Sequence, residues 1–462
     1  MRLNTATGFE QVVTATAFGA IRQALSGEKS RFQALFFVYY ASFSGFAVFR
    51  NVYLEEMGMS GSAMGQIGFL MTATGVAVQP VWGLITDYLR AERPVLIVGA
   101  VASALALLAY PAAEGLSAPF LLVAVGTAIY SAARAPIVPI TNGLVLSRGY
   151  DYGSVRAFGS IAFGIGSLGF GFLVAALGTA SVVYFYVGGT AVLVAIVLSV
   201  SESPEDDESD ESGAGNGHES DGENDENGHE NGHEGDGEND ENGDENDESD
   251  DEATLSEAVR ALVTNVDFLL VLLVGFLVGL GIRGGSAFFS VYMRAVDAGV
   301  VLGPWSLSPD AMTGIAWALK TVFEAVAFVY AIRLSWSYRS FLVVGGVAAA
   351  LPNLVYGLTA QPWAIVAVQT AGGLGYALFY VAVVNLVYVV ASDRVTSTAQ
   401  TALTGVGIGF GGAVGQVVAG ELHDLVGVQN LFLYLAAVGF VGAAAGVFVR
   451  QNGTLASDGM TA

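Results

Sequence analysis

Apolar residues fill twelve long stretches of this chain, and one acidic run divides them into two groups of six. Each stretch is long enough to cross roughly 30 Å of hydrocarbon, which takes about 20 helical residues. Because the alternating pattern of membrane strands is absent, helices must satisfy the backbone. We therefore predict an all-α membrane protein with twelve transmembrane helices. The predicted spans are 33–54, 63–87, 94–113, 118–146, 154–177, 181–200, 262–292, 310–334, 340–358, 361–391, 398–420 and 428–449.

Basic residues are distributed unevenly around these spans. Of the 18 Lys and Arg residues, only Arg50 and Arg294 fall on the outer side when both termini are placed inside. Arg134, Arg283 and Lys320 fall within spans, and all the others are cytoplasmic. Cytoplasmic loops of membrane proteins carry an excess of Lys and Arg. The distribution predicts a multi-pass protein of the cell membrane with both termini in the cytoplasm.

The two groups of six spans resemble each other in sequence. Tyr53 and Tyr292 end the first and seventh spans, and Asn142 and Asn385 fall in the fourth and tenth. Because each group has an even number of spans, both groups run in the same direction across the membrane, which makes them parallel repeats. Such repeats place a substrate site between the two halves, near the middle of the membrane.

An acidic linker joins the two repeats. Residues 201–252 contain 25 of the 42 Asp and Glu residues and no Lys or Arg, so the formal net charge of −24 belongs to this segment. Acids and bases nearly balance elsewhere, and nothing indicates a nucleic acid partner. A segment of this composition cannot bury enough apolar surface to fold. The predicted division is a cytoplasmic segment at 1–32, a six-helix bundle at 33–200, a disordered cytoplasmic linker at 201–255, a second bundle at 256–450 and a tail at 451–462.

Four charged residues lie deep inside predicted spans, and these are Arg134, Arg283, Lys320 and Glu324. A bare charge is costly in hydrocarbon, so such residues usually face a cavity or a partner and mark a pathway. Lys320 and Glu324 lie four residues apart on one helix face, so a buried ion pair that locks the helix is an alternative. For Arg134 the alternative is a structural role, because Pro136 interrupts the helix and frees carbonyl groups nearby.

The charge of these four residues favours one class of substrate. Three positive charges and one negative charge give a net charge near +2, which favours an anion over a neutral sugar. Glu324 is the one deeply placed carboxylate, and it is the candidate to carry a proton if transport is proton-coupled. Uncharged polar residues in the spans could supply orienting hydrogen bonds, or could simply pack. These are Tyr39, Tyr40, Asn142, Gln369, Tyr380 and Asn385.

Two stretches carry a resemblance to a known family. The loop after the second span contains Gly83, Asp87, Arg90 and Arg93. It resembles the signature loop of the major facilitator superfamily, with Tyr88 where that family usually has a basic residue. The stretch 152–160 is similar to one found in relatives of lactose permease, nucleoside permeases and the 3-phenylpropionate transporter. The resemblance implies a cytoplasmic gate formed by Gly83, Asp87, Arg90, Arg93 and Arg156.

These observations predict a secondary active transporter that moves a small organic anion by alternating access with proton symport. The related branch often carries His in the tenth span, where this chain has Gly372 and Tyr380. A sugar or nucleoside symporter is the alternative, and a transporter-like sensor without flux is the alternative of another class. The chain has no Cys and no Gly-Lys-Ser/Thr phosphate loop. We expect no enzyme, cofactor or metal, and a monomer whose partners are substrate, protons and lipid.

Overall fold

The computed structural model describes residues 27–89, 92–200, 257, 259–331, 333–391 and 395–450. The predicted acidic linker at 201–255 and the predicted tail at 451–462 lie outside the described residues. Most of the predicted N-terminal segment and Arg90 of the predicted gate lie outside them as well.

The first half of the chain consists of helices of very unequal length. In chain order they are α2 (Glu28–Glu56), α3 (Gly61–Leu89), α4 (Glu92–Leu107), α5 (Ala109–Ala113), α6 (Phe120–Arg134), α7 (Ile137–Ser147), α8 (Tyr152–Leu177) and α9 (Ser181–Ser199). Pro136 separates α6 from α7 at the point where the sequence predicts one interrupted span, because proline lacks the N–H that the helix requires.

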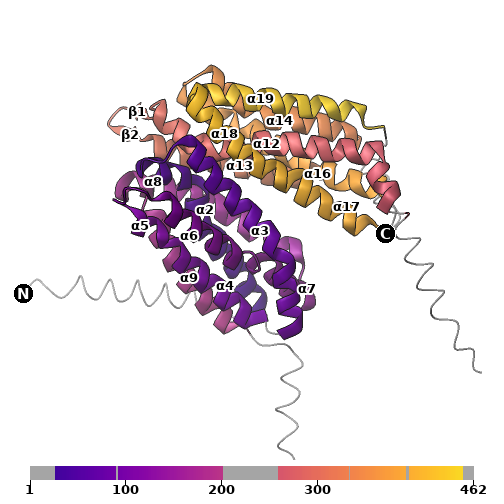
Figure 1. The fold of residues 1–462 in the computed structure, drawn as a ribbon, viewed down its shortest axis with the longest axis horizontal. Coiled ribbons are helices and arrows are strands. Elements are labelled where there is room, and N and C mark those ends of the chain that lie inside the picture. The colour runs from indigo at the N-terminus through magenta and orange to yellow at the C-terminus, as the bar shows by residue number, and fades with distance from the viewer. Residues whose placement is uncertain are drawn as a thin grey trace, which may run out of the picture.

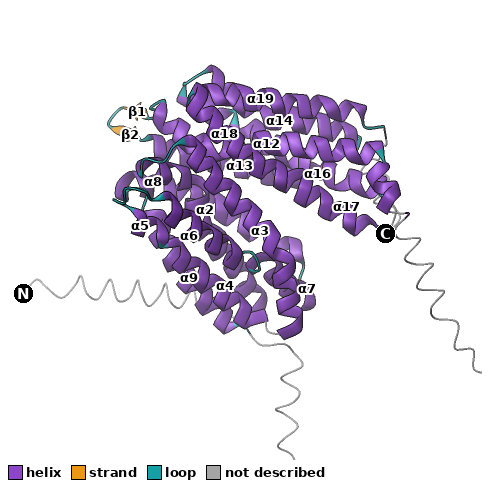
Figure 2. Ribbon diagram, in the orientation of Figure 1, coloured by secondary structure: helices purple, strands orange, loops and turns teal. Residues whose placement is uncertain are grey.

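The second half repeats this plan and adds a small β-hairpin. Its elements are α12 (Val266–Ala295), β1 (Val300–Leu302), β2 (Trp305–Leu307), α13 (Pro309–Ala331), α14 (Tyr338–Leu358), α15 (Pro362–Ala367), α16 (Gln369–Val390), α17 (Thr396–Ala402), η2 (Leu403–Phe410), α18 (Gly411–Val426), α19 (Val428–Ala445) and η3 (Gly446–Phe448). The hairpin, which the sequence analysis did not predict, pairs Val300 with Leu307 in antiparallel register (Figure 2).

Twelve helical segments of the described residues are long and apolar enough to cross a membrane, which confirms the predicted fold class. Five of them join shorter elements: Glu92–Ala113 contains α4 and α5, Phe120–Ser147 contains α6 and α7, Pro362–Val390 contains α15 and α16, Thr398–Val426 contains most of α17, η2 and α18, and Val428–Phe448 contains α19 and η3. The segment η2 is a π-helix, a form that is rare in proteins and is frequent at functional sites.

The two halves form separate bundles that meet at one end and diverge at the other (Figure 1). We call the end that carries β1 and β2 the hairpin end. The opposite end, where α9 ends at Ser199 and α12 begins at Val266, we call the linker end. The bundles lie together at the hairpin end, and α17 of one bundle is far from α7 of the other in the view.

Close contacts between the bundles lie near the hairpin end. A Cβ atom added to Gly171 of α8 would come within 3.0 Å of the Gly314 Cα atom in α13, so only glycine allows this approach. The carboxylate of Asp424 in α18 accepts hydrogen bonds from the backbone N–H groups of Gly61, at 2.7 Å, and Ser62, at 2.8 Å. These are the first residues of α3, where unpaired N–H groups favour an anion.

Polar side chains reinforce the same interface. Arg50 of α2 is only 5% exposed and donates a hydrogen bond to the Gln416 Oε1 atom of α18 at 3.0 Å. The Gln416 Nε2 atom donates in turn to the carbonyl of Gly68 at 3.1 Å. Arg294 of α12 forms an ion pair with Glu56 of α2. The hairpin end is therefore closed by direct bonds between the two halves.

The linker end has a different surface. Val81, Leu84 and Tyr88 in the last turns of α3 are 53%, 72% and 88% exposed. A Cβ atom added to Gly83 would meet nothing within 4 Å. The bundles are consequently apart here, whereas direct bonds hold them together at the hairpin end.

Candidate functional site

A cavity of about 260 Å³ lies between the two bundles and takes residues from both. The first half contributes α2 and α8, and the second half contributes α12, α13 and α16. The lining residues are Tyr40, Arg156, Gly159, Ser160, Phe163, Ile282, Arg283, Ser286, Trp317, Lys320, Thr321, Glu324 and Tyr376. The cavity therefore occupies the place that parallel repeats predict for a substrate site.

Helix α8 supplies its part of the wall as a single stripe. Arg156, Gly159, Ser160 and Phe163 follow one another at the spacing of a helix face. The helix begins where the Asp151 carboxylate accepts a hydrogen bond from the Ser154 backbone N–H at 2.9 Å. That bond holds the pKa of the Asp151 carboxyl below its usual range. The N-cap thus fixes the register from which Arg156, in the second turn, faces the cavity.

The Arg156 guanidinium lies over the ring of Tyr40, with its Cζ atom 4.5 Å from the ring centroid. Gly159 makes room for this pair, because a Cβ atom there would lie 2.7 Å from Tyr40 Cδ2 and 2.9 Å from Arg156 Nη1. A cation over an aromatic face is attracted by the ring quadrupole. The pair holds a positive charge on the wall of the first half, in a direction that leaves it open to the cavity.

Helix α13 faces α8 with a stripe of the same spacing. Trp317, Lys320, Thr321 and Glu324 line the cavity together. Gly373 of α16 lets the two helices pack without intervening side chains, since a Cβ atom there would lie 2.8 Å from the Glu324 backbone nitrogen. This close packing fixes the depth at which both charged side chains leave α13.

The ion pair between Lys320 and Glu324, which the sequence analysis gave as an alternative, is not formed. Within the described residues neither side chain has an ion-pair partner within 4.0 Å. The Lys320 Nζ atom lies instead 4.6 Å from the centroid of the Trp317 ring, one turn back on the same helix. The aromatic face competes with the carboxylate for the ammonium group, so Glu324 stays available on the cavity wall.

Arg283 completes the charges of the wall. Its stem packs on Gly412 of α18, where a Cβ atom would lie 2.6 Å from the Arg283 Cγ atom. Arg156, Arg283 and Lys320 together act electrostatically on Glu324. With all four groups charged, the wall carries three positive charges and one negative charge. The predicted net charge near +2 is kept, although Arg156 takes the place that the sequence analysis gave to Arg134.

Arg134 lies inside the first bundle and does not line this cavity. Its Nη1 atom donates a hydrogen bond of 2.5 Å to the Tyr39 hydroxyl. Its Cζ atom lies 4.4 Å from the ring centroid of Phe43 and 5.6 Å from that of Tyr130. Its buried Nε atom has no hydrogen-bond partner among the described residues. Aromatic rings, and not the carbonyls near Pro136 that the sequence suggested, surround this cation.

The other predicted residues fall in several places. Tyr40 lines the cavity, and Gln369 lines a smaller pocket beside it. Asn385 donates to the Val381 carbonyl of its own helix at 2.8 Å, and Tyr380 packs on Tyr376. The Asn142 Oδ1 atom is buried without a hydrogen-bond partner among the described residues, away from the cavity lining.

The predicted gate residues do not form one cluster. Arg93 lies at the linker end and donates to the Leu198 carbonyl. Gly83 also lies there, and Asp87 is in the last turn of α3. Arg156, which the resemblance groups with them, lines the central cavity.

Several lining residues were missed by the sequence analysis, namely Ser160, Phe163, Ser286, Trp317, Thr321 and Tyr376. For α8 and α13 a signal was present. Both stripes follow the i, i+3, i+4, i+7 spacing, and each includes a charge that the sequence analysis had singled out. No charge marks Tyr376, and its position follows only from the packing of α16 against α12 and α13.

Twelve spanning helices in two bundles, with a charged cavity between them, define a secondary transporter. The chain belongs to the MFS_1 like family, part of the major facilitator superfamily, whose model matches residues 30–434. The resemblance found in the signature loop and in 152–160 is confirmed at the level of this family.

Two relatives show how the chain compares in sequence. It is 31% identical to a maltose permease of Geobacillus stearothermophilus over 185 residues, which is 39% of this chain and 45% of that permease. The match thus spans less than half of the permease. It is 21% identical to the uncharacterized transporter YwbF of Bacillus subtilis (strain 168) over 422 residues, which is 87% of this chain and 92% of YwbF.

Solved structures share the fold at low sequence identity. The nucleoside transporter NupG matches with a TM-score of 0.71 and 16% identity, covering 92% of this chain and 99% of NupG. A POT family transporter in complex with 5-aminolevulinic acid matches with a TM-score of 0.63 and 12% identity, covering 90% of this chain and 94% of that one. Identities this low establish the architecture alone.

Proposed function

We propose that this protein carries a small organic anion across the cell membrane by alternating access to the central cavity. The observation that supports this most directly is the wall of the cavity, which bears Arg156, Arg283 and Lys320 against the single carboxylate of Glu324. Arg156 belongs to the first bundle, and Arg283 and Lys320 to the second. An anionic group between them would attract both bundles at once, which links binding to closure of the open end.

We assign the linker end to the cytoplasm, on the distribution of basic residues. The described conformation is then open toward the cytoplasm and closed outside. The outer contacts that must break to expose the site are those of Gln416, Asp424 and Arg294. In this proposal 33–200 and 256–450 are the two moving bundles, 201–255 connects them in the cytoplasm, and the protein acts as a monomer.

We assign proton coupling to Glu324. Protonation of this carboxyl would raise the net charge of the wall by one unit and so strengthen anion binding. By linkage, the bound anion would strengthen proton binding to the same extent. Proton and anion would then bind and leave together, which is the requirement for symport. Protons are the proposed coupling ion, and Glu324 is the proposed site.

The test is uptake by the purified protein in sealed proteoliposomes. A panel of labelled carboxylates, sugars and nucleosides is offered with and without an inward proton gradient. Accumulation of a carboxylate that collapses with the proton gradient is the expected result. Uptake of a carboxylate without dependence on the gradient would contradict the proton coupling and leave the substrate class in place. Binding without any flux would favour a sensor.

A neutral substrate is the second candidate. Tyr40, Phe163, Trp317 and Tyr376 give the cavity flat aromatic faces, on which sugar or nucleobase rings can stack. The relatives include a maltose permease and a nucleoside transporter by name. Accumulation of maltose or a nucleoside, with no response to carboxylates in the same panel, would favour this candidate over the anion.

A further inference from the structure

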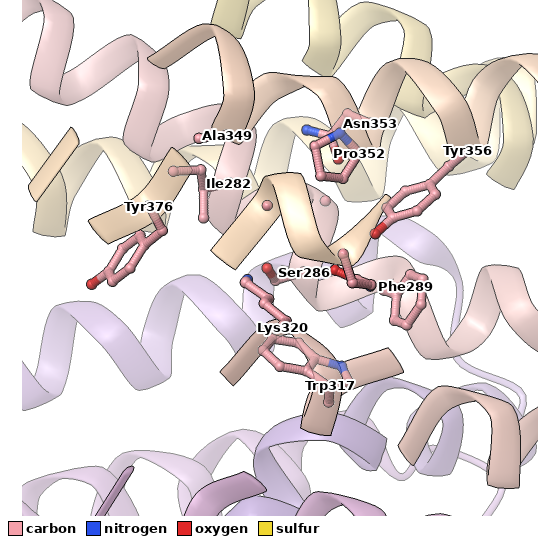
Figure 3. A pocket seen from close by; sticks show the side chains of 13 residues that line it. Ile282, Ser286, Phe289, Trp317, Lys320, Ala349, Pro352, Asn353, Tyr356 and Tyr376 are labelled. Carbon is pink, nitrogen blue, oxygen red and sulfur yellow. The ribbon is translucent and has the colours of Figure 1, made fainter. Parts of the chain in front are cut away.

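A second pocket adjoins the central cavity on the side of the second bundle (Figure 3). Its volume is about 30 Å³, and it lies among α12, α13, α14 and α16. Ile282, Ser286, Trp317, Lys320 and Tyr376 belong to both walls, so the two spaces share a boundary. We call this smaller space the side pocket. Lys320 and Trp317 lie on the boundary between it and the cavity.

The side pocket contains polar groups that lack partners in the protein. Gln369 is 4% exposed, and its side-chain amide has no hydrogen-bond partner in the described part of the chain. The same holds for the hydroxyl of Tyr356, a residue that is 3% exposed. The indole N–H of Trp317 is buried and unpaired among the described residues. Buried polar groups are normally hydrogen-bonded, so these groups require a ligand or water.

The groups are held in place by the packing around them. The Asn353 Nδ2 atom donates to the Gly281 carbonyl at 2.9 Å, which leaves its Oδ1 atom as an acceptor beside Gly285. Pro352 interrupts the hydrogen bonds of α14 at the same level, because it has no N–H to donate. In Figure 3, Asn353 and Tyr356 extend from α14, and Lys320 and Trp317 extend from α13, toward the same space.

The chemistry of the side pocket differs from that of the central cavity. Its hydrogen-bonding groups are neutral, apart from Lys320 at the boundary, and they include both donors and acceptors. A hydroxyl group can donate and accept at once, whereas a carboxylate only accepts. The volume accommodates roughly one or two water-sized groups. A hydroxyl or hydroxymethyl group fits these conditions, and a second carboxylate does not.

We propose that the side pocket is a hydroxyl-binding subsite, and that the transported anion is a hydroxylated carboxylate of the sugar-acid class. The carboxylate lies between Arg156 and Arg283, and a hydroxyl at the far end of the molecule reaches Gln369 and Ser286. This inference rests on the proposed anion transport and narrows it.

Three ligands with six-carbon chains separate the contribution of the carboxylate to binding from that of the hydroxyl groups. Gluconate carries a carboxylate and hydroxyls, hexanoate carries the carboxylate alone, and glucitol carries hydroxyls alone. Binding of each to the purified full chain in nanodiscs is measured by calorimetry. We expect gluconate to bind at least about tenfold more tightly than hexanoate, as two or more neutral hydrogen bonds would give. Glucitol should bind more weakly than gluconate because it leaves the cationic wall unpaired.

Variants then locate the hydroxyl subsite. Gln369→Leu, which keeps the side-chain volume similar, and Ser286→Ala should each reduce the preference for gluconate over hexanoate roughly threefold to tenfold, with hexanoate binding unchanged. Asn385→Leu is the matched control on the same helix, since that amide bonds its own backbone. It should leave all three affinities unchanged. Arg283→Gln should weaken gluconate and hexanoate alike.

The outcomes distinguish this inference from the function on which it rests. If hexanoate binds as tightly as gluconate, or if both side-pocket variants leave the preference unchanged, the hydroxyl subsite is wrong and the anion site stands. If glucitol binds and neither carboxylate does, the anion site is wrong, and loss of glucitol binding in Gln369→Leu would still support the subsite. Failure of gluconate and of a second sugar acid, galacturonate, to bind at millimolar concentrations would overturn the sugar-acid class.

Discussion

Two adjacent tyrosines of α2 each contact an arginine. Tyr39 contacts Arg134 inside the first bundle, and Tyr40 contacts Arg156 at the cavity. The rings of Tyr39 and Tyr40 are nearly perpendicular, at 86°, with centroids 5.0 Å apart. Tyr39 turns into the first bundle and bonds Arg134 through its hydroxyl. Tyr40 lines the cavity between the bundles, and the Arg156 guanidinium lies over its ring. The first pair is enclosed by Phe43 and Tyr130, and the second borders the cavity.

The comparison teaches how an arginine in a membrane helix should be interpreted. Both guanidinium groups are desolvated to some extent and both are stabilised by aromatic rings, so neither feature separates a structural residue from one that meets a ligand. The open space beside Arg156 does separate them. Arg134 is enclosed by Tyr39 and aromatic rings and does not line the cavity, whereas Arg156 lies on the cavity wall.

The largest expected effect concerns the carboxylate opposite these cations. Glu324→Gln should abolish accumulation driven by a proton gradient, because the amide cannot take up the proton. Exchange of internal for external substrate should persist, and anion affinity should stay the same or rise, since a negative charge is removed. Counterflow and gradient-driven uptake in proteoliposomes measure the two activities. Glu114→Gln, at a carboxylate that bonds Tyr53 outside the cavity, is the control. Undiminished gradient-driven uptake in a stable Glu324→Gln protein would remove Glu324 from the mechanism.

The next largest effect is on anion affinity, and it should distinguish arginines that line the cavity from an arginine outside it. Arg156→Gln and Arg283→Gln should each weaken anion binding about tenfold to hundredfold, which corresponds to one lost charge-assisted hydrogen bond of about 1.5–3 kcal/mol. Calorimetric titration measures this. Arg333→Gln removes a cation that lies 4.8 Å from the Tyr330 ring centroid, outside the cavity, and should have no effect on affinity. Equal losses in all three variants would mean that the overall charge, and not the site, governs binding.

Disruption of the Tyr39–Arg134 pair inside the first bundle should lower the stability of the protein and leave anion affinity unchanged. Tyr39→Phe removes the hydroxyl that accepts the Arg134 hydrogen bond and leaves the cation poorly satisfied. We expect a loss of about 1.5–3 kcal/mol in the free energy of unfolding, seen as a lower melting temperature, with anion affinity unchanged. Tyr40→Phe keeps the ring under Arg156 and should melt close to the unaltered protein. A drop in affinity in Tyr39→Phe would place Arg134 in the substrate site after all.

The smallest effect concerns the ring that holds Lys320. Trp317→Leu removes the aromatic face and should weaken anion binding roughly twofold to fivefold, because a cation–π contact contributes about 0.5–1 kcal/mol where water has access. Trp317→Phe, which keeps a smaller ring, should lose less. Tighter binding in Trp317→Leu would mean that the ring restrains Lys320 from the substrate.

The sequence predicted the architecture because the membrane imposes it. The bilayer thickness dictates the length of each apolar stretch, so the twelve spans could be counted, and the two matching sets of six spans pointed to a site between the halves. The same depth criterion identified Arg283, Lys320 and Glu324, which the cavity contains. Hydropathy reports how deep a residue lies and says little about the direction in which its side chain leaves the helix.

The sequence does not show in which direction a side chain leaves its helix, and this explains where the expected and observed sites differ. Arg134 and Arg156 could not be sorted by depth, because the sorting depends on which helices face each other. The side pocket could not be predicted, since its walls come from four helices that are distant in sequence. The Lys320–Glu324 ion pair was raised as an alternative from spacing alone, and the neighbouring Trp317 was not considered. The hairpin around Gly303 did have a local signal, namely two short apolar runs joined by a Gly-Pro turn.

The π-helix η2 has a mechanical consequence for the linker end. A π turn holds one residue more than an α turn, so conversion of η2 to α-helix would rotate α17 about its axis by roughly 100°. Such a rotation would turn a different face of 396–402 toward α16. The hydrogen bond from the Gln400 Nε2 atom to the Val384 carbonyl, 2.8 Å long, ties α17 to α16 and would have to open first. Ala399 and Leu403, both 0% exposed, pack in the core of the second half, so the rotation would also have to break this packing.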